Sequence, residues 1–201
     1  MKIGPKFKIA KRLGASIFEK TQSRKFALAQ ERSAKTKKRG RGPTEYGKQL
    51  PEIQKVRMTY GISERQFRNA VEESMESAVP VETLNRLLEL RLDNVIYRLG
   101  LAKTRRFARQ MVSHGHIMVN GVKTTIPSRR MRPGDRLSIR PGSRETGPFV
   151  GFAEKFMERP SLPTWISWNP KTMEGGVNEV PTRAAADPAG DLVAVMSFYS
   201  R

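Results

Sequence analysis

Residues 91–121 read RLDNVIYRLGLAKTRRFARQMVSHGHIMVNG, and this stretch decides the fold. Its apolar residues recur at helical spacing up to Leu101 and again over residues 104–113, where Thr104 is the predicted N-cap. The residues that follow alternate as a strand, and Asn120-Gly121 is the strongest two-residue hairpin signal. The stretch therefore predicts two helices followed by the first hairpin of a small sheet.

The preceding part of the chain has a helical pattern. Residues 53–60 place apolar side chains at helical spacing and end at Gly61, and Ser63 is a good N-cap for a further helix. Between residues 84 and 101 apolar side chains fall almost all the way round a helical wheel, as in a wholly buried helix. We therefore favour two helices broken at Leu92–Asp93, with Asp93 as the N-cap of the second helix and the break as a candidate domain boundary.

The C-terminal third has weaker signals. Residues 136–140 alternate as another strand after a Pro-Gly-Asp turn. Four prolines then interrupt regular structure between residues 160 and 181. Trp165 and Trp168 lie in that segment and are expected in a satellite core. Residues 192–198 alternate again and are predicted as a final strand, which we expect to pack on the helices of 51–90 because it has no local partner.

Basic residues are concentrated in two blocks. The 201-residue chain has 38 Lys and Arg against 19 Asp and Glu, a formal net charge of +19. Residues 1–50 hold 15 basic and 3 acidic side chains, residues 84–140 hold 13 and 3, and the remaining segments are nearly neutral. This clustering indicates a footprint on phosphates. It favours nucleic acid over a membrane surface, because no bulky amphipathic helix or lipidation site accompanies the charge.

Residues 1–50 are predicted to be a basic arm more than a domain. Five like charges fall between Lys35 and Arg41, and they repel one another. We therefore expect the arm to order only when phosphates neutralise it.

The residue types present exclude several kinds of chemistry. The absence of Cys rules out disulfides, thiolate nucleophiles and Cys-based metal sites, and two His cannot form a three-His site. His114 and His116 have no nearby carboxylate to complete a metal site, which favours hydrogen bonding or helix capping. Phosphate-binding glycine loops are absent. No apolar run reaches the length of a membrane span. We expect no metal, cofactor, small-molecule substrate, membrane association or enzymatic activity, and a soluble intracellular protein.

The predicted helix over residues 104–113 has a stripe of basic residues opposite its apolar face. The stripe consists of Arg105, Arg106 and Arg109. No acidic residue occurs between Asp93 and Asp135 to pair with them. We therefore expect their guanidinium groups to point into solvent or at phosphate. A solvated basic face is the plain alternative for such a helix.

Several segments resemble a known family. Four segments are similar to the RNA-binding module named after the fourth protein of the small ribosomal subunit. They are residues 91–100, 105–110, 114–121 and 132–135. Three further segments resemble the bacterial form of that ribosomal protein itself. They are residues 60–68, 173–175 and 198–201. The resemblance covers nearly the whole chain.

The resemblance implies an α+β fold. A helical first domain would carry a basic N-terminal arm and an inserted RNA-binding module, in which a helix pair packs on a small twisted antiparallel sheet. The implied boundaries are 1–50 for the arm, 51–90 with the returning tail 176–201 for the first domain, and 91–175 for the module and its extension.

The resemblance also implies a function. The protein would be a structural constituent of the small (30S) ribosomal subunit that binds 16S ribosomal RNA at a multi-helix junction and nucleates early assembly. It would line the messenger RNA entrance, near Lys37, Lys38, Arg39 and Arg41, and affect translational accuracy. Its implied partners are 16S ribosomal RNA, messenger RNA and the fifth small-subunit protein, and its location is cytoplasmic and ribosome-bound.

Zinc-carrying members of the family have Cys near the N-terminus, where this chain has Phe7 and Ala10. The chain therefore resembles the zinc-free branch. Two other classes of protein share the module. An RNA-modifying enzyme needs a separate catalytic domain with an Asp nucleophile, and no segment here qualifies. A free heat-shock-type RNA-binding factor is too small to include a helical first domain.

The candidate RNA-binding residues are basic or hydrogen-bonding side chains of the two basic blocks and of the helices between them. They are Lys6, Lys8, Lys11, Arg12, Lys37, Lys38, Arg39, Arg41, Lys55, Arg57, Arg65, Arg68, Arg91, Arg98, Lys103, Arg105, Arg106, Arg109, His114, His116, Asn120 and Lys123.

Overall fold

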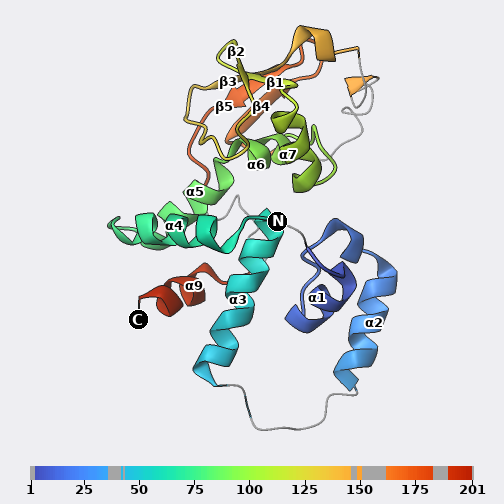
Figure 1. The fold of residues 1–201 in the computed structure, drawn as a ribbon, viewed down its shortest axis with the longest axis vertical. Coiled ribbons are helices and arrows are strands. Elements are labelled where there is room, and N and C mark those ends of the chain that lie inside the picture. Colours follow the sequence, from blue (N-terminus) through green and yellow to red (C-terminus); the bar gives the residue numbers. More distant parts are fainter. Residues whose placement is uncertain are drawn as a thin grey trace. The chain divides into compact units, whose positions relative to one another are not determined.

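The structure is a computed structural model that describes residues 3–35, 42, 44–145, 149–150, 162–182 and 190–200. In this part of the chain the fold is α+β, as predicted, with helices in the N-terminal part and an antiparallel sheet in the C-terminal part (Figure 1). The chain divides into two compact units, Met1–Leu84 with Asp187–Arg201, and Asn85–Ala186. No helix in the described ranges is long and apolar enough to cross a membrane.

Helices α3 (Glu45–Tyr60) and α4 (Glu64–Met75) organise the first unit. Gly61 ends α3 with a φ of 64°, a left-handed conformation that glycine adopts without steric cost. Ser63 then caps α4 by accepting a hydrogen bond from the backbone N–H of Gln66. The two predicted helices are confirmed, but α3 begins earlier than residue 53, because Thr44 supplies an N-cap.

The N-terminal basic block contains folded helices. These are α1 (Lys6–Leu13), the short 3₁₀ helix η1 (Glu19–Thr21) and α2 (Arg24–Lys35). Leu13, Phe18 and Phe26 are buried together, and the ring of Phe7 meets that of Phe26 edge-on at 5.7 Å. The prediction of an unfolded arm is therefore wrong for residues 6–35. Aromatic side chains that are far apart in the sequence form a small core once the helices turn the charged residues outward.

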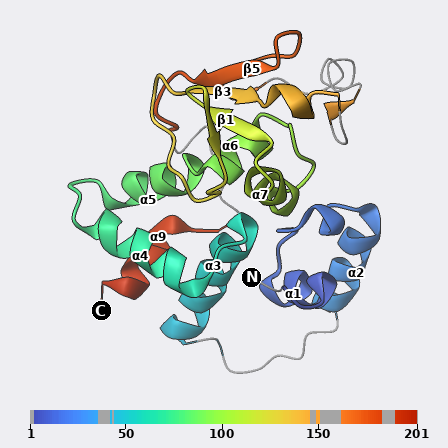
Figure 2. The same ribbon diagram turned by 45° about the horizontal axis from the view of Figure 1, so that its top comes forward.

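The C-terminal segment is a helix, α9 (Leu192–Tyr199), and the prediction of a strand is wrong. Asp191 caps it by accepting a hydrogen bond from the N–H of Val193 at 2.8 Å, and the buried residues Leu192 and Val195 follow helical spacing. A short apolar run fits either structure, and the surface that receives this one is helical. Helix α9 packs against α3 and α4, which confirms the predicted return of the tail (Figures 1 and 2).

The second unit contains an antiparallel five-stranded sheet in the order β2-β1-β3-β5-β4. Its strands are β1 (Ile117–Val119), β2 (Val122–Thr124), β3 (Arg136–Ile139), β4 (Ile166–Asn169) and β5 (Glu174–Val177). The predicted hairpin is confirmed, since Asn120 and Gly121 both have positive φ, 52° and 78°.

Strands β4 and β5 had no counterpart in the sequence-based prediction. A Cβ on Gly175 would meet the backbone oxygen of Ser167, so the close approach of these strands requires glycine. Trp165 and Trp168 are buried in the main core of this unit rather than in a satellite core. Because residues 174–177 form β5, the tail that returns to the first unit starts later than residue 176.

Helices α6 (Leu92–Arg98) and α7 (Arg105–Ser113) pack on one face of the sheet (Figure 2). Helix α5 (Pro80–Glu89) precedes them, and the predicted break between α5 and α6 is present. The backbone groups that the helices leave unpaired at this break are bonded by the loop before β3. Leu92 N–H donates to the Arg129 carbonyl, and Met131 N–H donates to the Leu90 carbonyl, each at 2.8 Å.

Asp93 is not an N-cap. It lies inside α6, and Arg91 occupies the cap position without a side-chain cap bond. The Asp93 carboxylate is instead occupied by arginine side chains, which are described below.

We predict that Leu192→Ala lowers the free energy of unfolding of the first unit by about 2–5 kcal/mol, because a fully buried side chain is removed from the contact with α3. Chemical denaturation with hydrogen exchange in α3 measures this. Val193→Ala is the control, since Val193 is 51% exposed, and it should change stability by no more than about 0.5 kcal/mol. Equal effects of the two substitutions would contradict the docking of α9.

Candidate nucleic-acid interface

Helix α7 holds the predicted arginine stripe in place through its cap and its apolar face. Thr104 begins the helix by accepting a hydrogen bond from the backbone N–H of Phe107 at 3.0 Å, as predicted. The apolar face is buried in the core beneath the sheet. This packing fixes the rotation of the helix about its axis, and Arg105, Arg106 and Arg109 are therefore directed away from the core.

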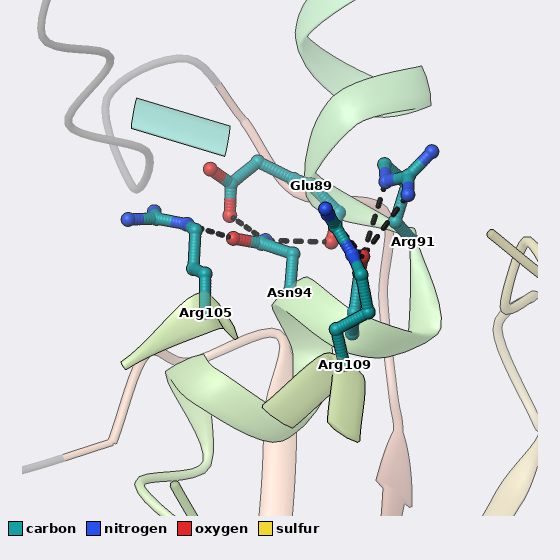
Figure 3. A network of polar contacts seen from close by, with 6 residues as sticks. Glu89, Arg91, Asn94, Arg105 and Arg109 are labelled. Carbon is teal, nitrogen blue, oxygen red and sulfur yellow. Dashed lines mark hydrogen bonds and ion pairs between the residues drawn. The ribbon is translucent and has the colours of Figure 1, made fainter. Parts of the chain in front are cut away.

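Two arginines meet at the carboxylate of Asp93, which is 2% exposed. Its Oδ2 accepts hydrogen bonds from Arg109 Nε at 2.8 Å and Arg109 Nη2 at 2.6 Å. Arg91 binds the same carboxylate through Nε at 3.1 Å and Nη2 at 3.0 Å. Figure 3 shows the side chains of Arg91 and Arg109 converging from different elements. The carboxylate therefore ties the junction of α5 and α6 to α7.

A second carboxylate, Glu89, is fully buried at the end of α5. Arg98 donates to its two oxygens from Nε at 2.9 Å and Nη2 at 2.8 Å. The side-chain amide of Asn94 donates to Glu89 Oε2 at 2.9 Å, and Asn94 Oδ1 accepts from Arg105 Nε at 2.8 Å (Figure 3). The Arg105 guanidinium also lies over the ring of Tyr97, 4.3 Å from its centroid, in a cation–π contact.

We call this network the arginine cluster. It consists of Arg91, Arg98, Arg105 and Arg109 with Glu89, Asp93 and Asn94. Withdrawing a carboxylate from water costs several kcal/mol unless it gains charged partners and hydrogen bonds, which both carboxylates have here. Three guanidinium groups bind the two carboxylates directly, and that of Arg105 is linked to Glu89 through Asn94. Arg91, Arg98 and Arg109 keep part of their side-chain surface in solvent. The exposed fractions are 11% for Arg91, 17% for Arg98 and 28% for Arg109.

The prediction that the whole stripe points into solvent or at phosphate is wrong for Arg105 and Arg109. Both bind side chains of α6, whereas Arg106 is exposed and has no partner among the described side chains. The prediction considered acidic residues close in sequence, and Asp93 reaches Arg109 only because α6 packs beside α7. A signal was present, since Asp93 is an acidic residue inside an apolar stretch.

Asn120 joins two turns at the edge of the sheet. Its amide nitrogen donates to Asp135 Oδ1 and its oxygen accepts from the backbone N–H of Arg136, each at 2.8 Å. Asp135 Oδ2 also accepts from the N–H of Arg132 at 2.8 Å. Lys123 is exposed, as are Arg132 and Arg136, two basic residues that the sequence-based candidate set lacked. Asn120 therefore has a structural role, and the exposed basic side chains named above lie on the same turns and strands.

His114 and His116 follow α7 and their ring centroids lie 6.0 Å apart. His116 Nδ1 is 3.0 Å from Ser143 Oγ. Burial lowers the pKa of His116 below its ordinary value of 6.5, and the nearby His114 and Arg140 lower it further. In the ranges that the structure describes, no three His, Asp or Glu side chains gather as metal ligands would.

Some candidate residues of the first unit have a polar partner, and others are exposed side chains for which no such partner is described. The paired ones are Lys55 with Glu52 at 2.6 Å, Arg57 with Glu64, Arg68 with Glu72 at 3.0 Å, and Arg12 with Gln54 at 3.0 Å. The other exposed candidates are Lys8, Lys11 and Arg65. In the second unit, Lys103 is exposed as well. The Lys6 ammonium lies 5.6 Å from the centroid of the Phe18 ring. Lys37, Lys38, Arg39 and Arg41 lie outside the described residues.

Comparison with known proteins matches nearly the whole chain to one family. Residues 1–89 match the ribosomal protein S4/S9 N-terminal domain, and residues 90–137 match the S4 domain. The chain is 44% identical over 207 residues to the small ribosomal subunit protein uS4 of Roseiflexus castenholzii, covering 99% of this chain and 98% of the relative. It is 39% identical over 202 residues to the uS4 protein of Geobacillus stearothermophilus, covering 98% of each. For Burkholderia mallei the identity is 40% over 206 residues, covering 99% and 98%.

We predict that Arg109→Gln destabilises the second unit by about 1–3 kcal/mol, because it leaves the buried Asp93 carboxylate with one charged partner fewer. Arg106→Gln on the same helix should change stability by no more than about 0.5 kcal/mol, because Arg106 is exposed. Thermal unfolding of the two variants without any ligand measures the difference. Equal melting temperatures would mean that the Asp93–Arg109 pair contributes nothing to stability.

A second prediction concerns pH. The pKa of His116 is lower in the folded than in the unfolded protein, so the unfolded chain takes up its proton first as the pH falls through about 6.5. The free energy of unfolding should therefore decrease below this pH, and His116→Gln should weaken the dependence. NMR titration of the His116 ring checks the cause directly. A pKa at or above 6.5 would contradict the burial of the ring.

Proposed function

The chain belongs to the small ribosomal subunit protein uS4 family, and from this premise we propose that it is a structural constituent of the 30S subunit that binds 16S ribosomal RNA directly. The similarity supports this proposal, because it covers nearly the full length of both this chain and its relatives. It includes both the helical N-terminal domain and the S4 RNA-binding domain.

The arginine cluster is the observation that carries the proposal. It lies within the matched S4 domain, apart from Glu89, which directly precedes it. Arginine binds phosphate through paired N–H groups and stacks on bases, so a rigid group of arginines suits an RNA surface. A-form RNA presents its phosphates and 2′-hydroxyls in a wide, shallow minor groove. We therefore infer that the cluster recognises the shape of an RNA junction more than its base sequence.

We further propose that the protein acts early in assembly of the subunit and contributes to the messenger RNA entrance and to translational accuracy. The family resemblance supports these roles, with Lys37, Lys38, Arg39 and Arg41 as the candidates at the entrance. The fifth small-subunit protein is the proposed protein neighbour. The concentration of basic residues in 1–50 fits a segment that lies among RNA strands.

The alternative of an RNA-modifying enzyme with an S4 domain is less well supported. Its catalytic domain would have to occupy the residues outside the S4 domain, and residues 1–89 match a ribosomal N-terminal domain instead. The relatives compared above are all named as ribosomal subunit proteins. We therefore propose that the chain has no enzymatic activity of its own.

Binding of full-length protein to 16S ribosomal RNA over a range of salt concentrations tests the proposal. We predict that Arg106→Gln lowers the affinity and reduces the slope of log K against log salt by about 1, because one phosphate contact is lost. Lys171→Gln is the matched control. It removes the same charge from an exposed residue in the turn between β4 and β5, outside the S4 domain, and should leave the slope unchanged.

Sedimentation tests residence in the ribosome. The protein should remain with small subunits through a high-salt wash. A free pool together with equal affinity for 16S and unrelated RNA would overturn the proposed function.

A further inference from the structure

The two buried carboxylates of the arginine cluster have an unusual place in a strongly basic protein. Glu89 is 0% and Asp93 is 2% exposed, although the chain has only 19 acidic residues and a net charge of +19. A neutral, well-packed side chain usually serves stability at such a position as well as a buried ion pair does. Stability alone therefore does not account for them, and their effect on the arginines that surround them has to be considered.

Asp93 brings two like charges together. Arg91 Nη2 and Arg109 Nε both lie within hydrogen-bond distance of its Oδ2, at 3.0 and 2.8 Å. Without the carboxylate the two guanidinium groups would repel each other at this separation, and each would return to the mobility of a long surface side chain. The carboxylate thus sets both the spacing of the pair and the plane of each guanidinium.

Glu89 does the same for Arg98 directly and for Arg105 through Asn94. The Asn94 amide has a defined direction, because its NH₂ group donates to Glu89 and its oxygen must then face Arg105. Tyr97 holds the other side of Arg105. Four arginines from three stretches of the chain are therefore fixed by two carboxylates before any RNA arrives.

We propose that Asp93 and Glu89 are positioning residues for RNA: their buried carboxylates hold the arginines of the cluster in the orientations that meet RNA phosphates. This inference rests on the proposed binding of 16S ribosomal RNA. It means that the affinity depends on negative charges beneath the binding surface as well as on positive charges upon it. Preorganisation of this kind strengthens binding because the entropy of ordering the side chains is already lost in the free protein.

The inference and a simple charge argument predict opposite results for Asp93→Asn. The substitution raises the net charge from +19 to +20, so charge alone predicts tighter binding to a polyanion. If Asp93 positions the arginines, affinity for 16S ribosomal RNA should fall by about tenfold, the smaller end of what loss of an orienting partner costs at other sites. The slope of log K against log salt should also shrink by about 1, because a misplaced arginine no longer displaces counterions.

Glu174→Gln is the control for charge. Glu174 is 61% exposed and 3.8 Å from Arg144, so the variant gains the same charge without disturbing a buried carboxylate. It should bind RNA as tightly as the parent or more tightly. A merely structural role for Asp93 would reduce the fraction of active protein and leave the salt slope of the remainder unchanged.

A second pair of variants keeps the test decisive if Asp93→Asn does not fold. Arg109→Lys retains the charge and a donor for Asp93 but loses the planar fork that grips the carboxylate. It should weaken RNA binding several-fold, whereas Arg86→Lys, the same substitution at an exposed arginine of α5 outside the S4 domain, should bind within about twofold of the parent.

Asp93→Asn binding as tightly as Glu174→Gln, or Arg109→Lys binding as tightly as Arg86→Lys, would overturn the inference. In that outcome the proposed function would stand if the parent protein still binds 16S ribosomal RNA in preference to unrelated RNA. Loss of that preference in the parent protein would remove the proposed function itself.

Discussion

The carboxylate of Asp93, almost wholly withdrawn from water, is the constraint on which the arrangement of the second unit's basic surface depends. A charge in that position is stable only with charged donors on several sides, and Arg91 and Arg109 supply them. Satisfying this one group ties the start of α6 to the middle of α7. Hydrophobic packing under the sheet holds the same two helices together, so the ionic and apolar contacts specify one arrangement.

The same two helices show how a stable core and a binding surface are built from one segment. The inner face of α7 is apolar and belongs to the core, while its outer face carries arginines. Because the inner face fixes the rotation of the helix, it also fixes the direction in which the outer face points. Arg106 is left exposed, and Arg105 and Arg109 are held more rigidly by α6.

In the first unit the C-terminal helix α9 is held by packing on α3 and α4, which lie far from it in the sequence. Leu192 and Val195 of α9 are fully buried, and the Tyr199 hydroxyl donates to Glu64 at 2.9 Å. Burial raises the pKa of Tyr199 above its ordinary value, so this hydroxyl remains a donor well above neutral pH. The N-terminal helices likewise close over their own aromatic residues. Helix α9 and the N-terminal helices thus add buried apolar side chains to a basic unit whose central helices, α3 and α4, would bury fewer of them alone.

The sequence by itself determined the elements whose signals are local: the helices ended by Gly61 and begun by Ser63 and Thr104, and the hairpin at Asn120-Gly121. Caps and turns act over a few residues, so their chemistry can be read without knowing the fold. The clustered positive charge similarly indicated a polyanion-binding protein, and the absence of cysteine ruled out disulfides and Cys-based metal sites. Tertiary structure alone decided the helical state of residues 192–199 and the partners of the arginine stripe. An apolar run takes the structure of the surface that buries it, and an ion pair depends on which helices lie side by side, which no local pattern records.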